Sequence, residues 1–375
     1  MNERETICAM ALSRIWRINS AASILAYRTA GSAEAIIDHH QEITKILPEA
    51  TPRFAEAMRD VSEPLHRAEV ELQYCRQHGI KVLCLNDDDY PQRLKECPDA
   101  PLVLYYKGNA NLNQKRVICI VGTRRCTIYG QDLVRRFLAD LHRMCPDTLV
   151  ISGLAYGIDI CAHRHSLENG MQTVGVLAHG LDTLYPPRHR QTAEKMINQG
   201  GLLTEFMTQT NADKVNFVRR NRIVAGMSDA CIVVESAQHG GALITADIAC
   251  GYSRDVFAFP GAVNAEYSEG CNLLIRDNKA GLITCAADFV DAMHWETDGT
   301  LHEAQQQGIE RQLFPELTND EQRVVAVLQK NNDLQINIIT VQAGISIGKL
   351  TATLFSLEMK GLIKTLPGGV YHLLK

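Results

Sequence analysis

The sequence predicts an α/β protein built on a doubly wound parallel sheet, with a helical domain before the sheet and a winged helix after it. Three observations support this prediction. Between residues 115 and 293, short apolar runs alternate with longer amphipathic segments, as in a parallel sheet covered by helices on both faces. Residues 1–75 carry helical patterns. From residue 313, three helical segments precede two short strands around a Pro-Gly-Gly turn, which is typical of a winged helix.

The predicted elements follow one another in a regular order. In the N-terminal part we expect helices over residues 5–18, 21–30, 32–40 and 54–77. Residues 80–109 are predicted to form an extended lead-in with its own strands and turns. Runs rich in Val, Ile and Leu predict the strands of the sheet at 115–122, 148–155, 172–180, 201–206, 229–236, 255–261 and 280–285. The helices between them are expected at 130–144, 158–169, 190–199, 219–229 and 242–252.

The domain boundaries follow from these patterns. We expect a helical domain at 1–75, a sheet domain at 76–293, a polar linker at 294–312 and a winged helix at 313–375. A chain of 375 residues is long enough for two or three domains.

Composition narrows the class of protein. The hydrophobic content of 46% and charged content of 22% are ordinary for a globular protein. No window approaches ~18 uninterrupted apolar residues, so we expect no membrane span, and the N-terminus shows no secretory signal. The twelve cysteines include no Cys-x-x-Cys pair, and several lie in apolar runs. We therefore expect a reduced, cytoplasmic protein without a metal site.

The first candidate site residues lie where the strand at 115–122 ends, in the stretch VGTRRCTIYG. Gly122 lets backbone N–H groups approach an anion, Thr123 can donate a hydrogen bond, and Arg124 and Arg125 carry positive charge. The alternative is a simple turn with solvated arginines. We favour anion binding, because three suitable features coincide at a strand end, where ligands of such sheets bind.

The second candidate segment is KVNFVRRNR, in a chain whose formal net charge is −5. No carboxylate lies within it, and we expect a helix to begin near Phe217. A solvated helical face is the usual explanation of such a charge run. The position near strand-end loops favours anion binding instead, by Lys214, Phe217, Arg219, Arg220, Asn221 and Arg222.

The third candidate loop is QHGGALITA, in which Gly240 and Gly241 follow a strand and Thr245 lies in the next helix. Backbone amides at a helix N-terminus suit a phosphate, although a plain connecting turn is the alternative.

Catalytic residues are not predicted. Asp159 is interpreted as a helix cap, and His163 and His165 as structural or surface residues. Glu205 and Glu235 end strands and could face the cleft as catalytic groups, with pairing to the arginines as the alternative.

Residues 80–290 resemble the DNA-processing protein A family, also called DprA or Smf. The resemblance depends on stretches in a specific order, namely YPQRLKECPDAPLVLYYKGN, VGTRR..TIYG, SGLAYGIDICAH, GLDTLYPPRHR, FVRRNRIVAG, GGALITADIA, FAFPG and GCNLLI. The N-terminal helices are similar to the family's SAM-like or helix-hairpin-helix domain, and the tail to its winged helix.

Three positions depart from the family pattern. Thr123 stands where Ser is usual, and His189 stands where Asn is usual. Gly240, Gly241 and Ala242 stand where Ser-Gly-Ser is usual, which removes two hydroxyl groups from that loop.

The resemblance implies an extended Rossmann fold that forms a homodimer and is not an enzyme. It implies a protein that binds and protects incoming single-stranded DNA and helps to load RecA recombinase in natural transformation and recombination. It assigns the DNA pocket to Gly122, Thr123, Arg124, Lys214 and Phe217, with phosphates near the cations and a base stacked on Phe217. No cofactor is implied.

Two other functions are considered. Nucleotide-processing hydrolases of the lysine-decarboxylase-like (LOG) group carry a Pro-Gly-Gly-x-Gly-Thr-x-x-Glu loop, but residues 239–245 lack the Pro, the third Gly and the downstream Glu. A winged-helix transcription regulator would need a basic tail. Residues 313–375 hold six Lys or Arg against five Asp or Glu, which favours a protein contact over duplex DNA.

Overall fold

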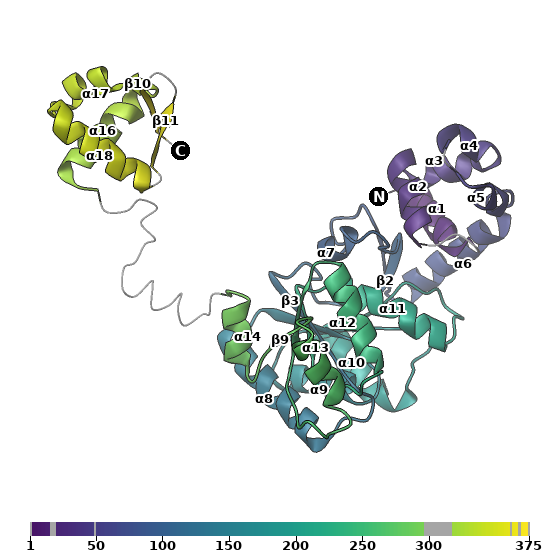
Figure 1. Ribbon diagram of the computed structural model, residues 1–375. Coiled ribbons are helices and arrows are strands. Elements are labelled where there is room, and N and C mark those ends of the chain that lie inside the picture. The colour runs from purple at the N-terminus through teal and green to yellow at the C-terminus, as the bar shows by residue number, and fades with distance from the viewer. Residues whose placement is uncertain are drawn as a thin grey trace. The chain divides into compact units, whose positions relative to one another are not determined.

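The computed structural model describes residues 2–15, 20–48, 50–295, 317–360, 362–366 and 369–373 (Figure 1). The chain forms two compact units, Met1–Asp298 and Gly299–Lys375. Residues 16–18 of the first expected helix lie outside the described residues, as does the expected linker beyond Trp295.

A nine-stranded sheet forms the centre of the first unit, in the order β1-β2-β6-β5-β4-β3-β7-β8-β9. The pairs β1–β2 and β2–β6 are antiparallel, and all other pairs in this sheet are parallel. The strands are β1 (Lys81–Cys84), β2 (Val103–Gly108), β3 (Arg116–Val121), β4 (Thr148–Ser152), β5 (Thr173–Val176), β6 (Gly200–Thr204), β7 (Ala230–Val233), β8 (Asp255–Ala258) and β9 (Gly281–Leu282). The α/β prediction with a mostly parallel sheet is confirmed, and the lead-in supplies the antiparallel edge.

Helices cover both faces of this sheet (Figure 1). In chain order they are α7 (Gln92–Lys95), α8 (Ile128–Met144), α9 (Ile158–Glu168), α10 (Arg190–Asn198), α11 (Lys214–Gly226), α12 (Gly241–Gly251), α13 (Glu269–Arg276) and α14 (Ala286–Ala292). Strand β3 is buried throughout, and its residues alternate between two cores. Ile118 and Ile120 pack in a cluster with residues of α8, α9 and α14, whereas Val117, Cys119 and Val121 belong to a cluster with residues of α11 and α12.

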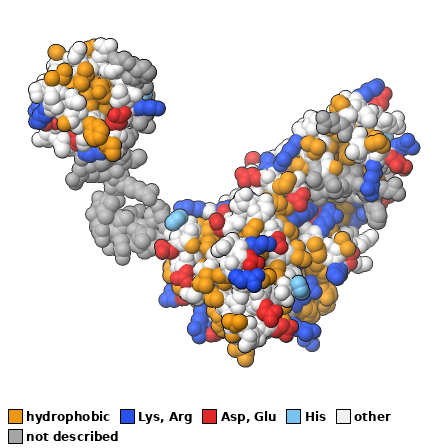
Figure 2. All heavy atoms as spheres, in the orientation of Figure 1, with side chains coloured by type: hydrophobic (Ala, Val, Ile, Leu, Met, Phe, Trp, Pro, Cys, Tyr) orange, Lys and Arg blue, Asp and Glu red, His pale blue; other side chains and the backbone are white. Residues whose placement is uncertain are grey.

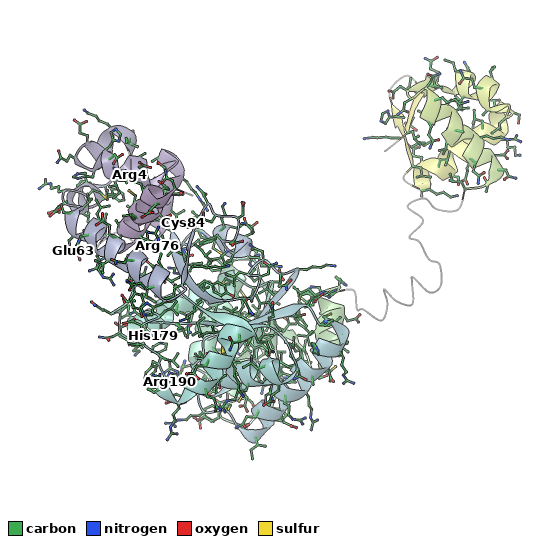
Figure 3. All side chains as sticks on the ribbon, turned by 180° about the vertical axis from the view of Figure 1, so that it is seen from behind. Arg4, Glu63, Arg76, Cys84, His179 and Arg190 are labelled. Carbon is green, nitrogen blue, oxygen red and sulfur yellow. The ribbon has the colours of Figure 1, made fainter. Side chains whose placement is uncertain are left out.

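The N-terminal helices pack on the sheet as part of the same unit. They are α1 (Glu3–Arg14), α2 (Ser20–Ala30), α3 (Ala33–Asp38), α4 (Ile43–Ile46), α5 (Pro52–Ala57) and α6 (Ser62–Gln77). Arg14 pairs with Glu63, and Arg76 with Glu3, each at 2.8 Å, which joins α1 to α6. Figure 3 labels Glu63 and Arg76 in this helical region. The buried carboxylate of Glu71 accepts hydrogen bonds from the N–H and hydroxyl of Thr208, and so attaches α6 to the segment after β6.

The second unit is a winged helix, as the sequence predicts. It contains α16 (Asn319–Lys330), α17 (Ile336–Ala343), α18 (Ile347–Met359) and a small antiparallel sheet of β10 (Leu334–Gln335), β11 (Ile363–Leu366) and β12 (Val370–Leu373). A capping box between Thr318 and Glu321 starts α16. Residues 367 and 368 of the expected turn lie outside the described residues.

Among the described residues, no single helix has the length and apolar character needed to cross a membrane. The pair α17 and α18 meets those criteria only when both helices are counted together, across a bend of 106°.

Candidate functional site

A cavity of about 670 Å³ opens where the connections of the sheet change direction. Strands β3 and β7 are neighbours, but the chain continues from β3 to β4 and from β7 to β8, in opposite directions along the sheet. Ligands of doubly wound sheets bind at such a point. Ten predicted site residues line this cavity, namely Gly122, Thr123, Arg124, Lys214, Phe217, Arg220, Asn221, Gly240, Gly241 and Thr245.

The loop after β3 is fixed by its backbone. The N–H of Thr123 donates to the carbonyl of Glu235 at 2.7 Å, and its carbonyl accepts from the N–H of Ile158 at 3.2 Å. A side chain at Gly122 would not fit, because its Cβ would lie 2.4 Å from Ile158 and 2.9 Å from the Glu235 carbonyl. The loop therefore holds the exposed Arg124 at the cavity on a rigid support.

Helix α11 presents its site residues along one side. It begins at Lys214, three residues before the predicted start near Phe217, because Asp213 caps it by accepting from the N–H of Asn216 at 2.8 Å. Lys214 and Phe217 are three positions apart, and Arg220 follows after three more, so these side chains are neighbours on the helix surface. All three line the cavity.

The ring of Phe217 lies among cations. The Arg124 guanidinium is 4.9 Å from its centroid and that of Arg220 is 5.8 Å away, both within the range of a cation–π interaction. Tyr185 packs edge-on against the same ring, with the centroids 5.9 Å apart. Phe217 is half-buried, so part of its ring faces the cavity.

Arg220 is an internal support of this arrangement. It is 4% exposed and donates to the carbonyls of Gly153, at 2.6 Å, and Val176. Burial lowers the pKa of Arg220 to about 10, although nearby Asp159 opposes this shift. Burial also raises the pKa of Asp159, against the effect of Arg220. A Cβ at Gly153 would lie 2.4 Å from the Arg220 guanidinium, so this glycine makes room for the arginine.

Two of the predicted arginines lie elsewhere. Arg222 is 6% exposed, and its guanidinium is 2.6 Å from the Glu205 carboxylate and 2.5 Å from the Asp99 carbonyl. Arg219 contacts the same carboxylate at 2.8 Å. Neither residue lines the cavity, because each is turned away from the line formed by Lys214 and Phe217. Glu205 is thus a partner of arginines, which is one of the two alternatives considered from the sequence.

Arg125 is exposed on the loop after β3 and is also absent from the cavity lining. Glu235 pairs with Thr127 rather than with an arginine. Its carboxylate accepts hydrogen bonds from the N–H of Thr127 at 2.8 Å and from its hydroxyl at 2.5 Å.

The start of α12 closes the other side of the cavity. Gly240 is the N-cap residue, Gly241 begins the helix, and Thr245 is buried one turn later. The first N–H groups of a helix have no partner within it and favour an anion. His239 also lines the cavity, although sequence reasoning did not single it out.

The histidines of α9 do not form a metal site. His163 is buried, bonds to the Thr173 hydroxyl at 2.7 Å, and has a pKa lowered by burial to about 3. His165 pairs with Glu168 at 2.7 Å. In the part of the chain that the structure describes, no group of three or more His, Cys, Asp or Glu could hold a metal ion.

Comparison with known proteins identifies matching families. Residues 81–294 match the family model described as DNA recombination-mediator protein A. Residues 310–369 match the DprA winged helix domain.

Named relatives agree with these matches. DNA processing protein DprA of Streptococcus pneumoniae is 38% identical over 204 residues, which are 54% of this chain and 71% of the relative. Protein Smf of Escherichia coli is 31% identical over 326 residues, covering 85% of this chain and 84% of that protein.

Two solved structures resemble the fold. DNA processing protein A from S. pneumoniae has 30% identity and a TM-score of 0.56, over 73% of this chain and 98% of that chain. DNA processing protein A from Helicobacter pylori, described for its unique single-stranded DNA binding mode, has 26% identity and a TM-score of 0.52. That match covers 57% of this chain and 95% of the H. pylori chain.

Proposed function

Because this chain belongs to the DNA recombination-mediator protein A family, also named DprA or Smf, we propose that it binds single-stranded DNA during recombination. The observation that carries the proposal is the half-buried ring of Phe217 inside a cavity, with Arg124 and Lys214 beside it. Cations that track phosphates and an aromatic face for a base are the two components of sequence-tolerant single-strand binding. The H. pylori relative, described for its single-stranded DNA binding mode, supports this function.

The contacts suggest how a strand is held. The forked guanidinium of Arg124 and the ammonium of Lys214 are placed to neutralise phosphates, and the first turn of α12 offers backbone N–H groups to another. Arg220 is buried between carbonyls, so we assign it to positioning Phe217 rather than to DNA contact. Arg219 and Arg222 are assigned to the ion pairs with Glu205.

We further propose the role that the family resemblance implies. The protein acts in the cytoplasm as a homodimer, protects incoming single strands and helps to load RecA recombinase during natural transformation. These steps involve partner surfaces other than the cavity.

We propose that the protein is not an enzyme. The buried Asp159 is the carboxylate in the cavity lining, and it is engaged by Arg220. The loop at 239–245 lacks the glutamate of the LOG hydrolases. Release of phosphate or ribose phosphate from nucleotides, lost on Arg124→Ala, would contradict this proposal.

The winged helix is proposed to contact protein rather than duplex DNA. Helix α18 is the third helix of this unit, and in some proteins of the helix-turn-helix class the third helix contacts DNA bases. On α18 the large hydrophobic side chains that are exposed are Ile347, Phe355 and Met359. The exposed Lys349 pairs with Asp320 at 2.5 Å. Figure 2 shows hydrophobic side chains on the visible face of this unit. This surface favours binding to a protein over the binding to duplex DNA that a transcription regulator would need.

The test compares single-stranded with duplex DNA of equal length by fluorescence anisotropy at several salt concentrations. We expect tighter binding to single strands. Arg124→Ala should weaken binding and reduce the slope of log affinity against log salt by about 0.7. Arg219→Ala is the matched control, because this arginine is also exposed but lies outside the cavity, and it should change neither value. Equal or tighter binding to duplex, or equal effects of the two substitutions, would refute the proposal.

A further inference from the structure

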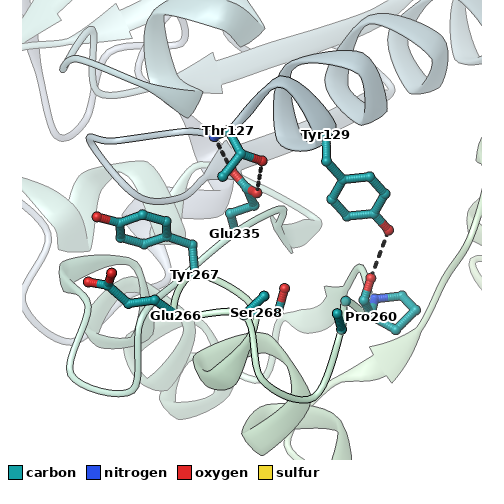
Figure 4. Close-up of a pocket in the computed structure, with 10 residues that line it drawn as sticks. Thr127, Tyr129, Glu235, Pro260, Glu266, Tyr267 and Ser268 are labelled. Atoms are coloured by element: carbon teal, nitrogen blue, oxygen red, sulfur yellow. Dashed lines mark hydrogen bonds between the residues drawn. The ribbon is translucent and has the colours of Figure 1, made fainter.

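A second cavity, of about 610 Å³, is shown in Figure 4. It is enclosed by the start of α8, the end of β7 and the loop between β8 and α13. The residues that line it are mostly apolar or aromatic, namely Thr127, Tyr129, Glu235, Pro260, Gly261, Ala262, Ala265, Glu266, Tyr267 and Ser268.

The two cavities share one wall, the loop from Thr123 to Thr127. At one end of the loop, the N–H of Thr123 donates to the Glu235 carbonyl. At the other end, the Glu235 carboxylate accepts two hydrogen bonds from Thr127, which Figure 4 shows. Glu235 therefore fixes the loop from both sides, and its side chain lies in the second cavity while Thr123 and Arg124 line the first.

Two tyrosines in the second cavity are held on rigid supports. The hydroxyl of Tyr129 donates to the carbonyl of Pro260 at 2.9 Å and so joins the first turn of α8 to the loop after β8 (Figure 4). The backbone of Tyr267 is fixed where the N–H of Ser236 donates to its carbonyl at 2.7 Å. Its ring is half-buried and lines the cavity.

The chemistry of the lining selects the ligand. Among the described residues that line this cavity, the charged ones are Glu235 and Glu266, and neither Lys nor Arg is present. A phosphate would meet repulsion from these carboxylates. A neutral, planar heterocycle can stack on a tyrosine ring, since every base has a π-face.

We propose that the second cavity receives a base of the same single strand, whose backbone crosses the shared loop beside Arg125. The inference rests on the proposed function, because the first cavity must hold the strand. Arg125 is exposed on the loop between the two cavities, where it can neutralise the crossing phosphate. This placement gives a role to an arginine that neither cavity uses.

The other possible occupant of this surface is a second copy of the chain. Ile128 is 85% exposed and Val263 is 84% exposed, and each lies next to the lining residues in sequence. Apolar side chains of this kind can also belong to a protein interface. The experiment therefore measures the oligomeric state along with DNA binding.

The test measures the affinity of the full-length protein for oligothymidylates of stepwise increasing length, by fluorescence anisotropy. Tyr267→Ala should bind the shortest oligonucleotides as the wild type does. It should lose about fivefold or more in affinity for lengths that reach the second cavity, since stacking of one base is worth about that much. Tyr267→Phe is the matched control and should follow the wild type, because it keeps the ring.

The outcomes are distinguishable. If the wild type binds no oligonucleotide of any length, both the proposed function and this inference fail. If the wild type binds but Tyr267→Ala matches it at all lengths, only this inference is refuted. If Tyr267→Ala changes the molar mass in light scattering and weakens all lengths alike, the surface belongs to a second copy and the inference is also refuted.

Discussion

Phe217→Ala is the substitution that best separates stacking from packing in the candidate site. The ring is half-buried and is contacted by the guanidinium groups of Arg124 and Arg220 and by the edge of Tyr185. If a base stacks on its open face, removal of the ring should weaken DNA binding without altering the number of neutralised phosphates. If the ring only fills space, the loss should appear in folding stability.

The expected magnitudes differ enough to be measured. Stacking of one base on an aromatic ring is worth ~1–3 kcal/mol, which is about 5- to 150-fold in affinity. A fully buried Phe replaced by Ala costs ~3–5 kcal/mol of folding free energy, so a half-buried ring should cost roughly 1–2 kcal/mol. The salt slope should stay at the wild-type value, because stacking releases no counterions.

The assays are anisotropy titration with a single-stranded oligonucleotide at several salt concentrations and urea unfolding of the same samples. Phe206→Ala is the matched control. Phe206 also faces an arginine, with the Arg219 guanidinium 5.4 Å from its ring centroid, but it is buried outside the cavity. The Phe206→Ala variant should lose more folding stability than Phe217→Ala, and its folded molecules should bind single-stranded DNA with the wild-type affinity. An unchanged affinity in Phe217→Ala, with the loss confined to folding stability, would refute the stacking role.

Three further predictions follow from the same contacts. Glu205→Ala should destabilise the first unit by ~3–5 kcal/mol in urea unfolding, because buried Arg222 loses its carboxylate partner, and a change within error would contradict this. A chain ending at residue 306 should bind single strands with an affinity within about tenfold of the full chain, or ~1.4 kcal/mol, because the tail is nearly balanced in charge. A larger loss of affinity in anisotropy titrations would show that the winged helix binds DNA. In that unit, burial opposes ionisation of Glu321, but hydrogen bonds from Lys360, Thr318 and Ser356 outweigh it and lower the pKa from 4.5 to about 2. The ionised carboxylate of Glu321 therefore stabilises the folded state above pH 4.5, and this stabilisation is lost as the pH falls through about 2. Hydrogen exchange of residues 317–360 should show this loss of stability in the wild type but not in Glu321→Gln.

The sequence by itself determined the elements and the chemistry at their ends. Apolar runs such as Arg116–Val121 identified the buried strands, because only a strand covered on both faces carries apolar residues at nearly every position. The Gly-Thr-Arg turn was recognisable at the end of one of these strands. The charge run from Lys214 to Arg222 was also recognisable, but the sequence placed the start of its helix near Phe217, and only the structure shows that Lys214 belongs to α11.

Only the tertiary structure decided which cations face the cavity. Arg219, Arg220 and Arg222 look equivalent in the sequence, yet Arg220 is buried between carbonyls while its neighbours pair with Glu205. Their separation follows from the helical period of α11, because residues that are close in a helical sequence point in different directions. The order of β4, β3 and β7 likewise brings the loops after β3 and β7 together from far apart in the chain. Local sequence sets backbone conformation, but the partner of a long charged side chain depends on which carbonyls and carboxylates the packed sheet places within its reach.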